Sequence, residues 1–227
     1  MPPKPKVLTK FIWSPAGNQV NLRQQILDHQ ITFVSGPTGT GKTFSSIMTA
    51  LELLDLSIKN GGVQHIIVSR PLVAAGKGFG FLPGDLQEKA APFMQSIKDT
   101  IIKSEHPKMQ SIIEGDGLSV VPIEVCRSLT FDDAFVFLDE AQNTTCSQME
   151  LFLTRLGPNS RMVISGDIYQ KDICGPDGFS HALNLFAENP LFGKAKLSLD
   201  DIQRHGIVKE VVIAYNLDRE KPKSFGG

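Results

Sequence analysis

The strongest chemical signal in the sequence is the segment 36–43, Gly-Pro-Thr-Gly-Thr-Gly-Lys-Thr, which matches the pattern GxxxxGK[ST]. Glycines let the backbone curl so that successive N–H groups point inward and bind phosphate oxygens. In this pattern Lys42 reaches the β- and γ-phosphates, and the Thr43 hydroxyl binds Mg²⁺. The segment therefore predicts a nucleotide-binding loop with ATP and Mg²⁺ as cofactors, formed by Gly36, Pro37, Thr38, Gly39, Thr40, Gly41, Lys42 and Thr43.

A second chemical signal is the pair Asp139 and Glu140, which ends the apolar run 135–138. We expect Asp139 to face the phosphate loop from a neighbouring strand and to hold Mg²⁺ directly or through water. Glu140 is then placed to polarise the attacking water. A bound metal ion offsets the repulsion between the two carboxylates. The pair favours hydrolysis over phosphate transfer to a small molecule, and its bland alternative is a strand that ends in surface acids.

Apolar runs and helical periodicity predict the elements that position these residues. Short apolar runs predict strands, and apolar residues at helical spacing, with capping boxes at 85–88 and 147–150, predict helices. Such alternation implies an α/β fold, with a mostly parallel sheet covered by helices on both faces and ligands at the carboxyl ends of the strands. The expected strands are 31–34, 65–69, 119–123, 135–138 and 161–165, and the expected helices are 44–58, one from 85, 147–156, 179–187 and 207–215.

The composition fits one globular domain. The chain has 227 residues, 41% of them hydrophobic and 21% charged, with a formal net charge of −1. We expect a single domain at 11–219, between a disordered arm at 1–10 and a disordered tail at 220–227. No apolar run reaches the length of a membrane span, and no secretory signal begins the chain, so we expect it in the cytoplasm. The three cysteines lack metal-ligand spacing.

Residues 139–142, Asp-Glu-Ala-Gln, together with Gly166-Asp167 and Gln170, resemble the first motor domain of superfamily-one helicases. The resemblance implies a RecA-like P-loop NTPase core in which Gln170 senses the γ-phosphate. The alternative for Gln170 is a polar loop residue. The helicase resemblance also suggests that Gln19, upstream of the first strand, reads adenine, since an amide both donates and accepts hydrogen bonds. The alternative for Gln19 is a helix-start residue.

Three segments, 81–89 (Phe-Leu-Pro-Gly-Asp-Leu-Gln-Glu-Lys), 139–145 (Asp-Glu-Ala-Gln-Asn-Thr-Thr) and 204–208 (Arg-His-Gly-Ile-Val), resemble the PhoH-like family of ATPases. The resemblance covers residues 18–215. One departure is Gly206, where proline is expected, and it should only loosen the start of that helix. The resemblance implies a phosphate-starvation-associated ATPase with a helicase-like core and assembly into a homo-oligomeric ring, with a hexamer expected. Some relatives carry an upstream ribonuclease domain, which we expect to be absent because only 30 residues precede Ile31.

Two arginines are further candidates. Arg204, just before the last helix, can act as an arginine finger. It would complete the active site of a neighbouring subunit by neutralising charge on the transferred phosphoryl group. A surface salt bridge and a helix contact are its alternatives, and the family resemblance favours the finger. Arg70, at the end of its strand, touches either the γ-phosphate or a nucleic-acid strand.

The leading hypothesis is Mg²⁺-dependent ATP hydrolysis coupled to binding or unwinding of RNA or single-stranded DNA. The sequence contains one helicase-like core, so a ring neighbour would have to supply the second face. The alternative is a nucleotide-dependent binding or scaffold module without productive turnover, against which Asp139 and Glu140 argue. A P-loop kinase would need an acceptor site and a lid, and neither is identified.

Overall fold

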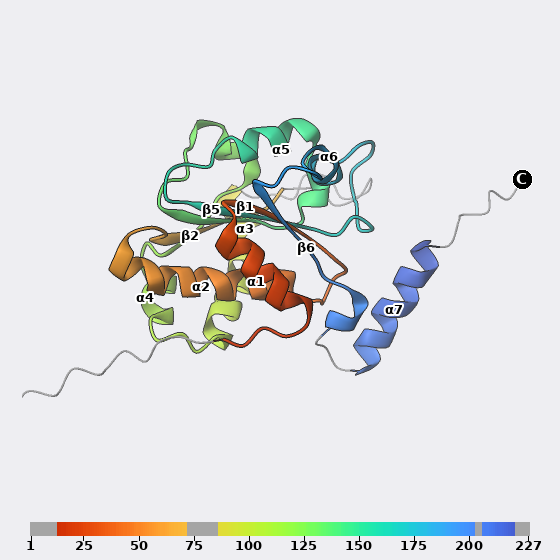
Figure 1. Ribbon diagram of the computed structural model, residues 1–227, viewed down its shortest axis with the longest axis horizontal. Helices are drawn as coiled ribbons and strands as arrows, with labels where there is room; N and C mark the ends of the chain where they lie inside the picture. Colours follow the sequence, from red (N-terminus) through yellow and green to blue (C-terminus); the bar gives the residue numbers. More distant parts are fainter. Residues whose placement is uncertain (1–12, 72–85, 203–205, 221–227) are drawn as a thin grey trace, which may run out of the picture.

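Six strands form the centre of the molecule, and every pairing between them is parallel (Figure 1). The computed structural model describes residues 13–71, 86–202 and 206–220. The predicted α/β fold is therefore confirmed, whereas the predicted arm and tail lie largely outside the described residues. The sheet has the order β3-β2-β4-β5-β1-β6, built from β1 (Ile31–Ser35), β2 (His65–Ser69), β3 (Leu118–Val120), β4 (Ala134–Leu138), β5 (Arg161–Gly166) and β6 (Phe192–Lys196).

Helices cover both faces of the sheet, because side chains that alternate along each strand point to opposite sides. On β4, Phe135 and Phe137 join one buried cluster, whereas Val136 and Leu138 join the other. Figure 1 shows the two helical layers on opposite sides of the strands. The first cluster packs under α1 (Asn18–Asp28), α2 (Lys42–Asn60), α3 (Leu86–Lys103) and α4 (Met109–Glu114), and the second under the 3₁₀ helix η1 (Ile123–Ser128), α5 (Cys146–Leu153) and α6 (Gly178–Leu185).

The strand order places the loops that carry chemistry side by side at one edge of the sheet. Arg70 follows β2, the pair 139–140 follows β4, Asp167 follows β5, and the loop 36–41 follows β1. The strands β2, β4, β5 and β1 are consecutive in the sheet. We expected the strand before Asp139 to adjoin the strand before the phosphate loop. That expectation was wrong, because β5 lies between β4 and β1 and adds its own loop to the site.

Two predicted elements end three residues earlier than expected. The strand expected at 119–123 is β3, Leu118–Val120, because Pro122 has no N–H for a ladder and the chain then enters η1. The helix expected at 147–156 is α5, Cys146–Leu153. Its capping box is formed by Thr145 and Gln148 and not by residues 147–150. Its end comes early because the Arg155 carbonyl accepts a hydrogen bond from the Phe131 N–H, which draws residues 155–157 into pairing with the chain before β4.

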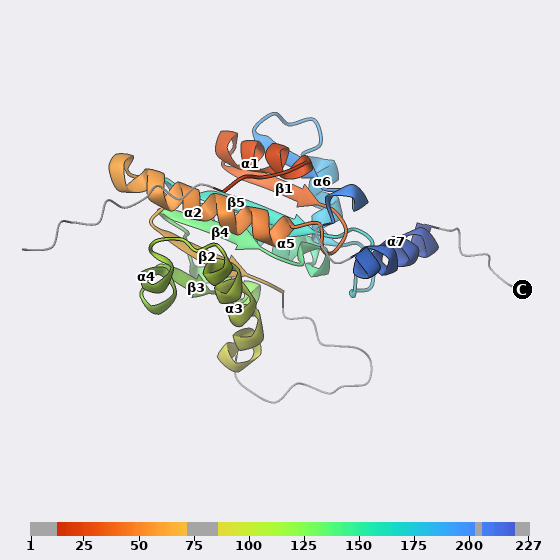
Figure 2. The ribbon, with the colours of Figure 1, turned by 90° about the horizontal axis from the view of Figure 1, so that it is seen from below.

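The structure also contains elements that were not predicted, and its last helix lies at the margin of the fold. Helix α1 and strand β6 were not predicted, and they pack against each other beside β1. The last helix, α7 (Gly206–Glu220), begins at the glycine that stands where the family resemblance predicts proline. It lies apart from the sheet layers (Figure 2). Among the described residues, no helix is long and apolar enough to cross a membrane.

Candidate functional site

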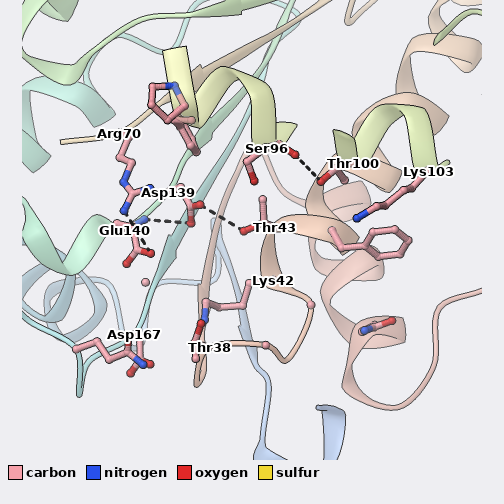
Figure 3. Close-up of a pocket in the computed structure, with 18 residues that line it drawn as sticks. Thr38, Lys42, Thr43, Arg70, Ser96, Thr100, Lys103, Asp139, Glu140 and Asp167 are labelled. Carbon is pink, nitrogen blue, oxygen red and sulfur yellow. Dashed lines mark hydrogen bonds and ion pairs between the residues drawn. The ribbon is translucent and has the colours of Figure 1, made fainter. Parts of the chain in front are cut away.

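A pocket of about 720 Å³ lies at the carboxyl edge of the sheet and contains most of the predicted site residues. Its size is in the range of small-molecule and cofactor sites. Figure 3 shows Lys42 and Thr43 on one side, Asp139, Glu140 and Arg70 facing them, and α3 side chains as a further wall. The predicted residues that line it are Gln19, Thr38, Gly39, Gly41, Lys42, Thr43, Arg70, Asp139, Glu140 and Gln170.

The loop 36–41 forms a glycine-rich cradle at the start of α2. Gly39 and Gly41 have φ angles of 81° and 91°, a left-handed conformation that strongly favours glycine. A side chain at position 41 would also collide with Gln19, since an added Cβ would lie 2.6 Å from its Nε2 atom. Because α2 begins at Lys42, its first N–H groups and the positive end of its dipole face the pocket.

Lys42 lies in the middle of this cradle. Its ammonium donates hydrogen bonds to the carbonyl oxygens of Gly36 and Pro37. Burial lowers the pKa of Lys42, and the negative charges of Asp167, Asp139 and Glu140 oppose that change in this order. An ammonium held in a poorly hydrated place attracts an anion more strongly than one in water.

Thr43 and Asp139 meet across the pocket floor. The Thr43 hydroxyl donates to Oδ2 of Asp139 at 3.4 Å (Figure 3). Burial raises the pKa of Asp139, and the adjacent Glu140 carboxylate adds to the rise. A hydroxyl and a carboxylate this close, with room for phosphate beside them, form a donor set of hard oxygens that suits Mg²⁺. The described residues contain no group of three or more His, Cys, Asp or Glu that could hold a metal ion.

Glu140 has an unusual backbone and two side-chain partners. Its φ and ψ angles are 51° and 40°, a left-handed conformation that costs free energy in a residue other than glycine. Such strain is common at functional sites. Its Oε2 accepts a hydrogen bond from Gln142, and its Oε1 lies 3.8 Å from the guanidinium of Arg70. The Arg70 guanidinium also lies over the Phe93 ring, 5.5 Å from the centroid.

The loop after β5 completes the wall opposite α3. Gln170 lines the pocket, and its backbone carbonyl accepts from the Gln142 side chain at 3.1 Å. Asp167 is buried; its Oδ1 accepts from the Tyr169 N–H, and its Oδ2 has no hydrogen-bond partner among the described residues. The motif Gly166-Asp167 was noted in the sequence, and Asp167 lines the pocket because β5 lies between β4 and β1.

Gln19 combines features of both of its predicted roles. It lies in the first turn of α1, which agrees with a helix-start residue. Its side chain is 3% exposed, lines the pocket, and donates from Nε2 to the Thr40 carbonyl at 3.4 Å. Gln19 therefore contacts the phosphate loop at Thr40, and its contact with adenine remains a prediction.

Two predictions fall outside the described residues. Arg204 lies in the segment 203–205, between the 3₁₀ helix η3 (Leu199–Asp201) and α7, so its role as a finger stays a prediction. Most of the segment 81–89 also lies outside, although α3 begins at Leu86 within it.

Sequence reasoning missed the pocket wall formed by α3. Ser96, Thr100 and Lys103 line the pocket from this helix (Figure 3). Their spacing of four and three residues places polar groups on one helical face, and that spacing was the available signal. Phe44, which packs edge-on against Trp13, lines the same pocket and was taken only as a helix residue.

Comparison with known proteins places the chain among one group of sequences. The family model described as "PhoH-like protein" matches residues 12–216. The PhoH-like protein of Bacillus subtilis (strain 168) is 39% identical over 195 residues, which is 83% of this chain and 59% of that protein. Protein PhoH of Escherichia coli (strain K12) is 35% identical over 205 residues, 87% of this chain and 56% of that protein. The chain thus spans less than three fifths of the length of these relatives.

Solved structures with a similar arrangement include two helicases. The Pif1 helicase from Candida albicans aligns with a TM-score of 0.41 at 16% identity, over 82% of this chain and 40% of that one. Arterivirus nonstructural protein 10, a helicase in complex with DNA, aligns with a TM-score of 0.41 at 14% identity, over 78% of this chain and 37% of that one.

Proposed function

The chain belongs to the PhoH-like protein family, and we propose that this P-loop NTPase is a Mg²⁺-dependent ATP hydrolase. One observation carries the proposal: Thr43 and Asp139 approach to 3.4 Å in a pocket that also holds Lys42 and Glu140. A phosphate cradle, a place for a divalent cation and a base for water are the three parts that nucleotide hydrolysis needs.

The phosphate end of the nucleotide would lie over the start of α2. The loop N–H groups and Lys42 supply positive charge to the β- and γ-phosphates. Thr43 and Asp139 would hold Mg²⁺, which neutralises charge on the phosphate oxygens when bound. Gln19, beside Thr40, is our candidate for contact with the base.

Glu140 is our candidate for the general base. It follows Asp139 directly, its side chain is 36% exposed and it lines the pocket, so a water molecule can reach it. Gln170 is our candidate for the γ-phosphate sensor, because its loop adjoins that of Glu140 through Gln142. These assignments divide the work as in other P-loop hydrolases, where positioning and electrostatics provide most of the rate.

Arg70 lies beside Glu140, the proposed general base, and is a candidate to bind a phosphate group as well. Its guanidinium is 45% exposed and shared between Glu140 and Phe93. A γ-phosphate or the backbone of a nucleic-acid strand would compete for this cation. We therefore propose that ATP hydrolysis is coupled to RNA or single-stranded DNA in a cytoplasmic homo-oligomeric ring, probed first as a hexamer, with Arg204 acting on a neighbour's nucleotide.

A turnover measurement tests the proposal. Purified protein is assayed for phosphate release from ATP with Mg²⁺, with EDTA, and with added RNA or single-stranded DNA, and its mass in solution is measured in parallel. Mg²⁺-dependent release supports the hydrolase. Tight ATP binding without turnover under every condition would instead support the nucleotide-dependent binding or scaffold module.

A further inference from the structure

The side chain of Gln142 lies at the junction of two loops that frame the pocket. Gln142 belongs to the 3₁₀ helix η2 (Ala141–Asn143), and it is 1% exposed. Its Nε2 donates to Oε2 of Glu140 and to the backbone carbonyl of Gln170 at 3.1 Å. Its Oε1 accepts from the backbone N–H of Asp167 at 2.9 Å. Both amide donors and the acceptor are thus used, which fixes the side chain in one orientation.

The neighbouring residue Asn143 provides a natural comparison. Its Oδ1 accepts from the backbone N–H of Asp172 at 2.8 Å, and its Nδ2 donates to the Asp172 carboxylate at 3.2 Å. Asn143 is also buried, and it anchors the same β5–α6 loop. Among the described residues its side chain makes no hydrogen bond with Glu140, and the 2.9 Å bond from its backbone N–H to the Glu140 carbonyl does not depend on the side chain. Replacing the Asn143 side chain therefore separates loop anchoring from an effect on the Glu140 carboxylate.

We infer that Gln142 is a positioning residue that couples Glu140 to the segment 167–170 through one amide group. The inference rests on the proposed function, in which Glu140 is the base and Gln170 the sensor. Gln142 holds Oε2 of Glu140, whereas Oε1, within the part of the chain that the structure describes, has the 3.8 Å ion pair to Arg70. A shift of the segment 167–170 would move Gln142 and so the carboxylate that it holds.

This arrangement gives a physical reason for the motif Asp-Glu-Ala-Gln at 139–142. Glu140 lies two residues after the end of β4 and is in a left-handed conformation. A partly exposed glutamate has several rotamers, and a general base is effective only within hydrogen-bond reach of the water. One buried amide that binds the carboxylate removes that freedom, and its tie to Gln170 makes the base sensitive to the sensor loop.

The test is a double-mutant cycle in the full chain. Gln142→Met keeps the length and volume of the side chain but removes its hydrogen bonds, and it is made alone and together with Glu140→Gln. The matched control is Asn143→Ala, alone and with Glu140→Gln. Single-turnover hydrolysis is measured per bound ATP, so that any unfolded fraction does not affect the rate. Amide hydrogen exchange of the segment 166–172 is recorded without nucleotide as a readout independent of activity.

We expect Gln142→Met to slow hydrolysis roughly 10- to 100-fold, within the range for residues that act through a shared partner, with little change in ATP affinity. In the Glu140→Gln background the same change should cost less than about threefold, because the general base that Gln142 positions is already absent. Asn143→Ala should reduce the rate by the same factor in both backgrounds. The Asp167 amide should exchange faster in Gln142→Met and remain protected in Asn143→Ala.

Equal losses from Gln142→Met in both backgrounds, or no loss in either, would overturn the coupling, as would an Asp167 amide that stays protected. Failure of the proposed function has a different signature. In that case the unmodified protein does not hydrolyse ATP, or Glu140→Gln is fully active, whatever residue occupies position 142.

Discussion

The Thr43 hydroxyl lies 3.4 Å from the Asp139 carboxylate, although the strands that lead to these residues are not neighbours. Strand β5 lies between β1 and β4, so the two loops meet above its end. The same geometry inserts Asp167 and Gln170 into the pocket wall. The distance between β1 and β4 thus leaves room for a third loop without separating the two ligands proposed for Mg²⁺.

A substitution at Asp139 should separate stability from function. Burial, and then the charge of Glu140, raises the pKa of Asp139. The ionised carboxylate is therefore less favourable in the folded than in the unfolded chain. The contribution of this group to stability is most favourable below its unfolded pKa and is lost as pH rises through the raised folded pKa.

We expect Asp139→Asn to raise the Tm of the protein without Mg²⁺ or nucleotide at neutral pH, by about 2–4 °C for each kcal/mol gained in a chain of this size. The gain should shrink as pH falls through the folded pKa and vanish below the unfolded pKa, where Asp139 is neutral in both states. Hydrolysis should be lost in the same variant. Calorimetry from pH 4 to 8, with Asp132→Asn as an exposed control, measures the effect, and an unchanged or lower Tm at neutral pH would contradict it.

Lys42→Ala should abolish nucleotide binding or turnover while the fold remains intact. Lys42 is a half-buried cation whose pKa is lowered by desolvation, so the folded chain gains little from its charge. Among the described residues, its ammonium donates hydrogen bonds to carbonyls of its own loop. Circular dichroism tests the fold, and a fluorescent ATP analogue tests binding. Wild-type affinity in a folded variant would refute the assignment of the loop.

Glu140→Gln should bind ATP and Mg²⁺ but hydrolyse ATP roughly 10²-fold or more slowly, as expected for a lost general base. The amide retains the size of the side chain and its contact with Gln142 while it removes the basic oxygen. Glu150→Gln, at an exposed position of α5, is the control. Normal turnover in Glu140→Gln would make this residue structural and would direct the search for the base to Asp167.

Much of the site could be predicted from the sequence, because its main residues are fixed by local patterns. The glycines, Lys42 and Thr43 form one continuous loop, and the apolar strand before Asp139 marks its carboxyl end. Gln142 illustrates what local patterns omit. Its motif was recognised, yet its three hydrogen bonds join residues 2 to 28 positions apart, and this depends on the strand order.

Elements with weak periodicity were the ones missed. Strand β6 (Phe-Gly-Lys-Ala-Lys) contains two lysines and a glycine, and only its position at the sheet edge beside β1 makes it a strand. Helix α1 has few apolar residues, of which Leu22 and Ile26 are buried. In both cases tertiary contacts decide the structure over local propensity.

Arg204 is the subject of the last prediction, that it acts in trans on ATP bound by the adjacent subunit of a ring. The family resemblance motivates it, and so does the presence of one phosphate-loop motif in the sequence. An arginine finger stabilises charge in the transition state and contributes about 10³ to 10⁵ in rate. Arg204→Ala should therefore lower kcat while the affinity for ATP changes little.

A mixing experiment decides between action in cis and in trans. Arg204→Ala and Lys42→Ala are each expected to be inactive alone, the first because it lacks the finger and the second because it cannot bind phosphate. If the finger acts between subunits, mixed rings contain interfaces at which an intact loop faces an intact arginine, and activity returns. No recovery in rings shown to have exchanged subunits would indicate a cis or structural role. If Arg204 acts in cis, each subunit needs both groups, and each variant lacks one of them. Full activity in a strictly monomeric protein would refute the ring itself.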